Sequence, residues 1–216
     1  MEEIQEVQRS LPVLGKEAPD FEAPTTHGTI KLSDYRGKWV VLFSHPADFT
    51  PVCTSEFIGF AEKHEEFTKA NVQLIGLSVD SVSSHIAWVR NIEEKFGVNI
   101  PFPVIADLSM NVAKLYGMIQ EGESATVTVR TVFVIDPDGI LRAMIYYPLT
   151  NGRNMDEILR LIHSLQVTAT HKMATPANWR PGDAVVVPPP ATAEAAKTRM
   201  SEGYDCVDWY FCKKNL

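Results

Sequence analysis

The stretch KWVVLFSHPADFTPVCTSEF, residues 38–57, joins a continuous apolar run to a segment that contains a threonine followed by a proline. Its first part, KWVVLFSH, follows a turn-like sequence and is typical of a strand buried on both faces of a sheet. Thr50 and Pro51 are typical of the N-cap and the first position of a helix. The stretch therefore predicts a core strand, a short loop and a helix, the unit that α/β folds repeat.

The same alternation of apolar strands and amphipathic helices continues along the chain. Apolar runs predict strands at 38–45, 72–80, 103–107 and 131–136, and apolar spacings of three and four predict helices at 53–70, 82–96, 108–116 and 154–166. The sequence DPDG, residues 136–139, is a strong turn, so the strand before it should form an antiparallel hairpin with the segment after it. We therefore expect an α/β sandwich with an antiparallel part.

The composition excludes several classes of protein. Hydrophobic residues make up 45% of the chain and charged residues 22%, as in folded soluble domains. No segment approaches the roughly 18 consecutive apolar residues of a membrane-spanning helix, and a net charge of −7 argues against nucleic-acid binding. Residues 1–13 are acidic and lack the features of a secretory signal. We expect a cytoplasmic protein with no nucleic-acid and no membrane partner.

The composition changes after residue 168. Little periodicity and five prolines between residues 168 and 199 predict an extended arm rather than a second core. The chain ends in YDCVDWYFCKKNL, residues 204–216, whose aromatic side chains we expect to pack on the core or on a neighbouring subunit. We therefore divide the chain into a domain at 1–168 and a C-terminal arm at 169–216, which is a dimerisation region if its aromatic end packs on a neighbouring subunit.

Cys53 lies at the third position of the predicted helix, where a capping box would place a glutamate. The partial positive charge and free N–H groups of a helix N-terminus stabilise a thiolate over a thiol. Phe57 and Phe60 continue the same helix face, so the thiol should be buried in a pocket. Because burial disfavours a thiolate, a nearby cation is needed, and Arg130 and Arg153 are candidates. A lone buried cysteine is more often inert, so position alone leaves both readings open.

The segment Thr50 to Cys53 has the spacing of a redox C-x-x-C motif with threonine in place of the first cysteine. A hydroxyl cannot close a disulfide but can hold an oxygen-bearing substrate, which favours attack on a peroxide and a sulfenic acid product. A second thiol usually reduces such an acid, and the other two cysteines are Cys206 and Cys212. Their C-x₅-C spacing fits no strong zinc pattern, and we expect neither a metal nor a cofactor.

Pro46, Thr50 and Cys53 form the pattern P-x-x-x-T-x-x-C, which resembles the active-site motif of the peroxiredoxins. The resemblance covers nearly the whole chain and is strongest to the one-cysteine-type subfamily, in the archaeal branch whose C-terminal arm carries an extra cysteine pair. It implies a thioredoxin-like fold and a thiol-specific, thioredoxin-dependent type of peroxidase that reduces hydrogen peroxide and alkyl hydroperoxides to water and alcohols in antioxidant defence. It also implies a thioredoxin- or glutaredoxin-like reductant and homodimers assembled into a ring, commonly a decamer.

The resemblance further implies roles for individual residues. Cys53 would attack the peroxide, and Arg130 would stabilise both the thiolate and the peroxide oxygens. Thr50 would bind the peroxide through its hydroxyl, and Pro46 would shield the pocket from water. Glu56 and Arg153 match positions that would orient Arg130, and His45 lies where this subfamily keeps a histidine near the cysteine.

Most members of that subfamily lack a resolving cysteine, whereas this chain has two candidates. Cys212 is similar in position to the cysteine that resolves the sulfenic acid, usually from the neighbouring subunit, and Cys206 is the weaker candidate. Two other readings stay open: a redox sensor or holdase that Cys53 oxidation switches, and a disulfide oxidoreductase, which the threonine at position 50 disfavours.

Overall fold

Residues 11–216 are described by a computed structural model. Residues 1–10, which hold most of the acidic segment behind the expectation of a cytoplasmic protein, lie outside the described residues. The chain divides into two compact units, Met1–Met155 and Asp156–Leu216, and each is described by itself. Within the described part, no helix combines the length and the apolar character needed to span a bilayer.

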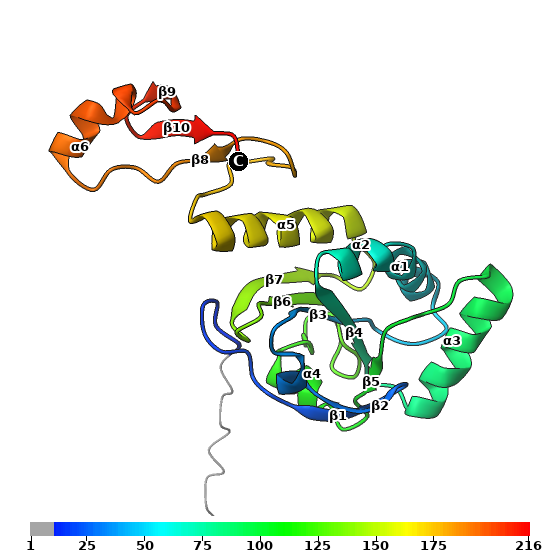
Figure 1. The fold of residues 1–216 in the computed structure, drawn as a ribbon. Coiled ribbons are helices and arrows are strands. Elements are labelled where there is room, and N and C mark those ends of the chain that lie inside the picture. Colours follow the sequence, from blue (N-terminus) through cyan, green and yellow to red (C-terminus); the bar gives the residue numbers. More distant parts are fainter. Residues whose placement is uncertain (1–10) are drawn as a thin grey trace, which may run out of the picture. The chain divides into compact units, whose positions relative to one another are not determined.

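The first unit is built on a seven-stranded mixed sheet with the order β2-β1-β5-β4-β3-β6-β7 (Figure 1). Its strands are β1 (Glu22–Thr25), β2 (Gly28–Lys31), β3 (Trp39–Ser44), β4 (Val72–Ser78), β5 (Val104–Ala106), β6 (Arg130–Ile135) and β7 (Leu141–Tyr147). β3, β4 and β5 are parallel to one another, while β6 pairs antiparallel with β3 and forms the predicted hairpin with β7. The predicted α/β class with an antiparallel part is confirmed.

Helices connect and cover the strands of this unit. They are η1 (Leu32–Tyr35), α1 (Pro51–Glu62), α2 (His64–Lys69), α3 (Val82–Phe96) and α4 (Asn111–Leu115). The single helix predicted at 53–70 is wrong in one respect, because Lys63 leaves the helical conformation with ψ near 0° and separates α1 from α2. The helix predicted at 108–116 begins later, after Met110, whose φ of 54° lies in the left-handed region.

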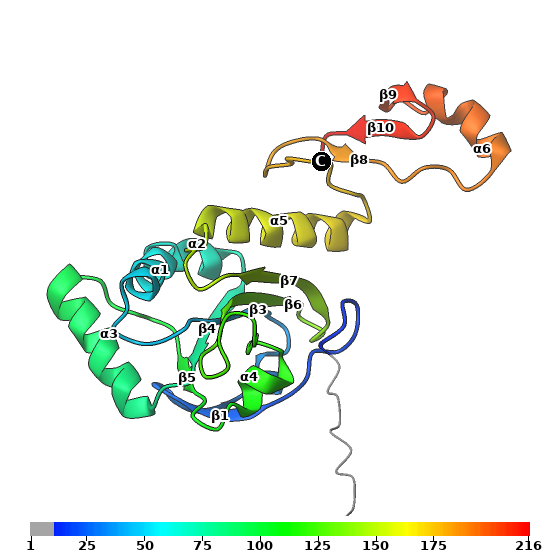
Figure 2. The same cartoon turned by 180° about the vertical axis from the view of Figure 1, so that it is seen from behind.

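Alternating side chains of β3 enter two separate cores. Val40 and Leu42 belong to a cluster that includes Val112 of α4. Phe43 points to the opposite face, where its ring stacks on Phe60 of α1 with centroids 4.1 Å apart. Figures 1 and 2 show α1 and α4 on opposite sides of the sheet. Because both faces of β3 are covered, its sequence is apolar without interruption, and its carboxyl end leads directly into α1.

The second unit contains α5 (Met155–His171), β8 (Val185–Val186), α6 (Ala193–Thr198), η2 (Arg199–Ser201), β9 (Asp205–Asp208) and β10 (Phe211–Lys214). The three strands form a small sheet with the order β8-β10-β9. Trp179 and Val185 are buried, and the Trp179 indole N–H donates to the Asp183 carbonyl at 3.0 Å. The arm therefore has more regular and buried structure than the extended chain that its prolines predict.

Cys206 and Cys212 are joined to each other by a disulfide. They face each other in register across the β9–β10 hairpin. Between them, Trp209 and Tyr210 remain exposed within this chain. The pairing was not expected from the sequence, which left both thiols as separate candidates for resolving Cys53.

Candidate active site

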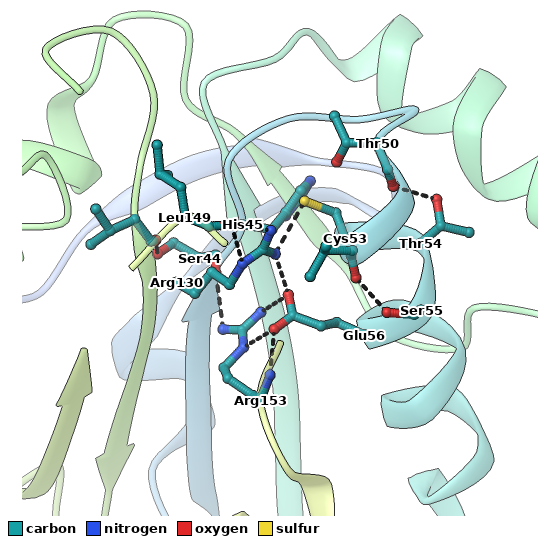
Figure 3. A network of polar contacts seen from close by, with 12 residues as sticks. Ser44, His45, Thr50, Cys53, Thr54, Ser55, Glu56, Arg130, Leu149 and Arg153 are labelled. Carbon is teal, nitrogen blue, oxygen red and sulfur yellow. Dashed lines mark hydrogen bonds and ion pairs between the residues drawn. The ribbon is translucent and has the colours of Figure 1, made fainter. Parts of the chain in front are cut away.

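Cys53 is the third residue of α1 and is completely buried (Figure 3). Pro51 occupies the first helical position and Thr50 the N-cap, as the sequence predicts. The position sets the thiol in the first turn, where backbone N–H groups lack intrahelical partners. Of the cysteines in the chain, Cys53 is the free one.

Thr50 occupies the N-cap without capping the helix through its side chain, so the simple capping expectation is wrong. Its hydroxyl donates instead to the Ala47 carbonyl at 2.9 Å, and its own carbonyl accepts from the Thr54 amide at 2.9 Å. The first-turn N–H groups beside Cys53 are therefore not consumed by this threonine. Pro46, at the start of the same loop, is half-buried.

Arg130 brings a positive charge to the sulfur from the first position of β6. Its Nη1 atom donates to Cys53 Sγ at 3.3 Å and to Glu56 Oε2 at 2.7 Å. Its Nε and Nη2 atoms donate to the Leu149 carbonyl at 3.0 and 2.7 Å, which fixes the plane of the guanidinium. Figure 3 shows this group between α1 and the segment that carries Leu149. The contact supplies the cation that a buried thiolate needs.

Glu56 lies one turn after Cys53 on α1 and is clamped by a second arginine, Arg153. The Arg153 Nε atom donates to Glu56 Oε1 at 2.9 Å, and Nη2 donates to Oε2 at 2.7 Å. Burial works to raise the pKa of Glu56, but the charge and hydrogen bonds of Arg153, followed by the charge of Arg130, outweigh it and hold that pKa below its ordinary value. Glu56 is therefore a carboxylate that orients both guanidinium groups.

Arg153 is itself held by the sheet. Its Nη1 atom donates to the carbonyls of Ser44 in β3 and Thr131 in β6, at 2.9 and 2.7 Å. Its guanidinium also lies over the Phe43 ring, 5.2 Å from the centroid. These contacts use the ends of two adjacent strands to fix the position of the charge.

The charges of this cluster do not cancel if Cys53 is neutral. Arg130 and Arg153 contribute two positive charges, and Glu56 contributes one negative charge, in a site where all three side chains are almost fully buried. An uncompensated charge in such surroundings is costly. A Cys53 thiolate would restore neutrality, so the arrangement favours the nucleophilic form of the sulfur.

His45 follows β3 and lies against the α1 face that carries Cys53. Its ring centroid is 4.7 Å from that of Phe57, one helical turn after the cysteine, and the side chain points toward Cys53 in Figure 3. Its Nε2 atom is 3.0 Å from Asp48 Oδ1, while its buried Nδ1 atom has no hydrogen-bond partner among the described residues. Burial lowers the pKa of His45, although the hydrogen bond and charge of Asp48 oppose that effect.

Asp48 does not face the sulfur as a competing negative charge, because it bonds to His45 and to His85 of α3. Ligand atoms from these three buried residues lie within 4.8 Å of one another, the spacing that a metal ion would require. Their polar atoms are already shared in direct hydrogen bonds, except His45 Nδ1. The geometry is therefore that of a proton-sharing network, and within the described residues it is the group that comes nearest to a metal site.

The structure brings seven predicted site residues together around one helix start. They are Cys53, Thr50, Arg130, Pro46, His45, Glu56 and Arg153. Cys206 and Cys212 belong to the second unit and are bonded to each other.

Two contributions to the site were not predicted. The Leu149 carbonyl that holds Arg130 carries no side-chain signal in the sequence. His85 and its bond to Asp48 were also missed, although His85 lies on the apolar stripe of α3 with Trp88 and Ile92, and a histidine in such a stripe is a detectable anomaly.

Comparison with known proteins shows which families and relatives this chain resembles. The chain matches the model of the AhpC/TSA family over residues 14–144 and that of the C-terminal domain of 1-Cys peroxiredoxin over residues 164–203. A peroxiredoxin of Aquifex aeolicus is 61% identical, with 96% of this chain and 98% of the relative covered. A peroxiredoxin of Methanosarcina mazei is 55% identical, with 94% and 98% covered.

Two solved structures are similar to this chain over nearly its whole length. A yeast mitochondrial 1-Cys peroxiredoxin is similar with a TM-score of 0.85 and 43% identity, covering 95% of this chain and 100% of that one. A Cys-to-Ser mutant of peroxiredoxin 6 from Arenicola marina gives a TM-score of 0.84 and 42% identity, covering 94% and 97%. The expected thioredoxin-like architecture is confirmed by these similarities.

Proposed function

This chain belongs to the peroxiredoxin family, and from that premise we propose that it is a thiol peroxidase that reduces hydrogen peroxide and organic hydroperoxides to water and alcohols. The observation that carries the proposal is the 3.3 Å contact between Arg130 Nη1 and Cys53 Sγ at a helix N-terminus. A buried thiol with its own guanidinium donor is arranged for nucleophilic attack rather than for filling space.

In the first step, the Cys53 thiolate attacks the terminal oxygen of the hydroperoxide. A sulfur–oxygen bond forms, the oxygen–oxygen bond breaks, and the leaving oxygen takes a proton to become water or an alcohol. Cys53 is left as a sulfenic acid. Arg130 donors stabilise the charge that develops on the oxygens, because they are fixed before the reaction by Leu149 and Glu56.

Thr50 and Pro46 would shape the pocket for the peroxide. The Thr50 hydroxyl, which now donates to Ala47, can turn toward an oxygen of the substrate without breaking any bond that caps the helix. Because Cys53 is fully buried, access for a peroxide requires this loop to move. A surface cavity of about 500 Å³ borders the loop and is lined in part by Phe49, Thr50 and Thr54.

We further propose that Cys212, from a neighbouring subunit, resolves the sulfenic acid. Its thiol would form a disulfide with Cys53 and release water. Attack of Cys206 on the Cys212 sulfur would then free Cys53 as a thiolate and leave the Cys206–Cys212 disulfide, the oxidised pair that this structure contains. A dithiol protein of the thioredoxin or glutaredoxin class would reduce that disulfide and complete the cycle.

The proposed enzyme is a cytoplasmic antioxidant that assembles from dimers into a ring, with a decamer as the expected size. β7 is at the edge of the sheet, and Trp209 and Tyr210 are exposed, so both units offer surface for contacts between copies. Sedimentation velocity of the reduced protein tests this assembly. A monomer at micromolar concentration would contradict it.

Turnover of peroxide separates an enzyme from a redox sensor. With an excess of dithiothreitol, each chain should consume many equivalents of hydrogen peroxide. A protein that stops after one equivalent of peroxide, although the thiol donor remains in excess, would instead be a redox sensor or holdase.

A further inference from the structure

His85 is enclosed by two hydrogen-bond acceptors. Its Nδ1 atom lies 2.8 Å from Asp48 Oδ2 and 3.0 Å from Oδ1, and its Nε2 atom lies 3.1 Å from the backbone carbonyl oxygen of Ile105. The imidazole is completely buried. A neutral imidazole carries one N–H and one lone pair, so it can satisfy only one of these two partners.

Asp48 cannot supply the missing proton. Although burial acts to raise the pKa of this carboxyl, hydrogen bonds from His45 and His85 and their charges hold the pKa far below its ordinary range. The carboxylate also accepts from the Ser84 hydroxyl at 2.8 Å. A backbone carbonyl has no proton to give. Both nitrogens of His85 must therefore carry hydrogen, which makes the ring a cation paired with Asp48.

This pairing determines the state of His45. Asp48 Oδ1 accepts from His45 Nε2 at 3.0 Å, so the ring proton of a neutral His45 belongs on Nε2. Its Nδ1 atom then presents a lone pair that has no partner within the described residues. A second positive charge on His45 would have to share one carboxylate with His85, and the two rings are only 6.1 Å apart.

We propose that His85 is a positioning residue: it carries a lasting positive charge and, through Asp48, holds His45 neutral with its Nδ1 lone pair open toward the Cys53 pocket. Other charged groups surround the network on both sides. Asp80, after β4, accepts from the Asp48 amide at 3.1 Å, and Arg130 and Glu56 lie at the sulfur. His85 thus leaves Arg130 as the cation at the sulfur and His45 as a hydrogen-bond acceptor beside it.

The consequence for catalysis rests on the proposed peroxidase function, but the protonation states can be measured without peroxide. Nitrogen-15 NMR of the histidine side chains in the full-length reduced protein reports which ring nitrogens carry hydrogen. At pH 7 we expect His85 to carry hydrogen on both ring nitrogens, because both face acceptors, and the exposed His27 is the reference histidine outside this network. His45 should show a protonated Nε2 and an unprotonated Nδ1. A neutral His85 at pH 7, or a proton on His45 Nδ1, would overturn the proposal.

A variant separates positioning from a merely structural role. In His85→Gln, the glutamine side-chain amide can still donate a hydrogen bond to Asp48, but the positive charge of His85 is lost. His45 should therefore gain its second proton on mild acidification. The rate constant for Cys53 oxidation should then fall by about tenfold between pH 8 and pH 6 relative to the parent protein. His27→Gln is the matched control and should change neither readout. A folded His85→Gln protein with the parental His45 signals would refute the inference, and if the variant does not fold, the spectra of the parent protein decide it.

Discussion

The Nη1 atom of Arg130 lies 3.3 Å from the Sγ atom of Cys53, although 77 positions separate the two residues in the chain. One residue begins β6 and the other lies in the first turn of α1, so the contact exists only because β3, which precedes α1, pairs directly with β6. The Leu149 carbonyl holds the remaining guanidinium donors. The fold therefore fixes the charge at the sulfur before any substrate arrives.

Arg130→Lys should slow Cys53 oxidation by a factor on the order of 10². A lysine ammonium is a point charge and cannot donate to Cys53, Glu56 and Leu149 at once in the plane that the guanidinium fork provides. Stopped-flow measurement of oxidation by hydrogen peroxide would show the loss. Arg142→Lys, on the partly exposed Arg142 that pairs with Asp136, is the matched control and should leave the rate unchanged. Equal rates in both variants would remove Arg130 from the proposed mechanism.

Cys53→Ser should abolish peroxide consumption while the fold is retained. The oxygen of serine fits the same space, but a hydroxyl at this position is not ionised and does not attack a peroxide. The measurement is peroxide loss over many turnovers with a dithiol donor, alongside circular dichroism to establish that the variant folds. Retained turnover in a folded variant would place the reactive thiol elsewhere in the chain.

Local patterns in the sequence predict the parts of the site that local rules govern. The apolar run at 38–45 predicts β3, and a threonine and a proline place Cys53 in the first turn of α1. The bonds that complete the site are tertiary. The Leu149 carbonyl is a backbone group, and a backbone acceptor carries no sequence signature. His85 is separated from Asp48 by 37 positions, so only the packing of α3 beside the loop reveals their bond.

In the C-terminal arm, too, local patterns predict some features, while others depend on contacts that the local sequence does not specify. Its prolines predict an extended arm, but β9 and β10 depend on a hairpin and a disulfide whose pairing the spacing of two cysteines does not dictate. The helix-capping bond expected from the Thr50 side chain is absent for a different reason: the hydroxyl donates to the Ala47 carbonyl of its own loop and accepts no hydrogen bond from the first turn of α1.

Glu56→Gln should destabilise the protein by about 3 to 5 kcal/mol, because it leaves Arg153 and Arg130 buried with reduced compensation. The pKa of Glu56 is lowered in the folded state by Arg153 and Arg130 in spite of burial, so its contribution to stability is present above the unfolded value of about 4.3 and is lost as the pH falls through the folded value. Thermal unfolding from neutral to acid pH measures both effects.

The parent protein should lose stability on acidification below about pH 4.3, and Glu56→Gln should lose less over the same range. Glu62→Gln, at an exposed position of the same helix, is the control and should change the free energy of unfolding by no more than about 0.5 kcal/mol. Parallel pH profiles for the parent and Glu56→Gln would contradict the assignment of Glu56 as a carboxylate clamped by two arginines.

Replacement of Cys212 and of Cys206 by serine should block the proposed cycle at two different steps. Without Cys212, Cys53 is still oxidised rapidly to sulfenic acid, but no disulfide between subunits forms, because the proposed resolving thiol is missing. Without Cys206, the disulfide between Cys53 and Cys212 forms and then accumulates, because no thiol remains to attack the Cys212 sulfur and close the pair seen in this structure. Non-reducing electrophoresis after one equivalent of peroxide, followed by mass spectrometry of the linked peptides, distinguishes these outcomes. A covalent dimer that persists in Cys212→Ser would assign resolution to Cys206, and monomers in both variants would show that an external thiol resolves Cys53 directly.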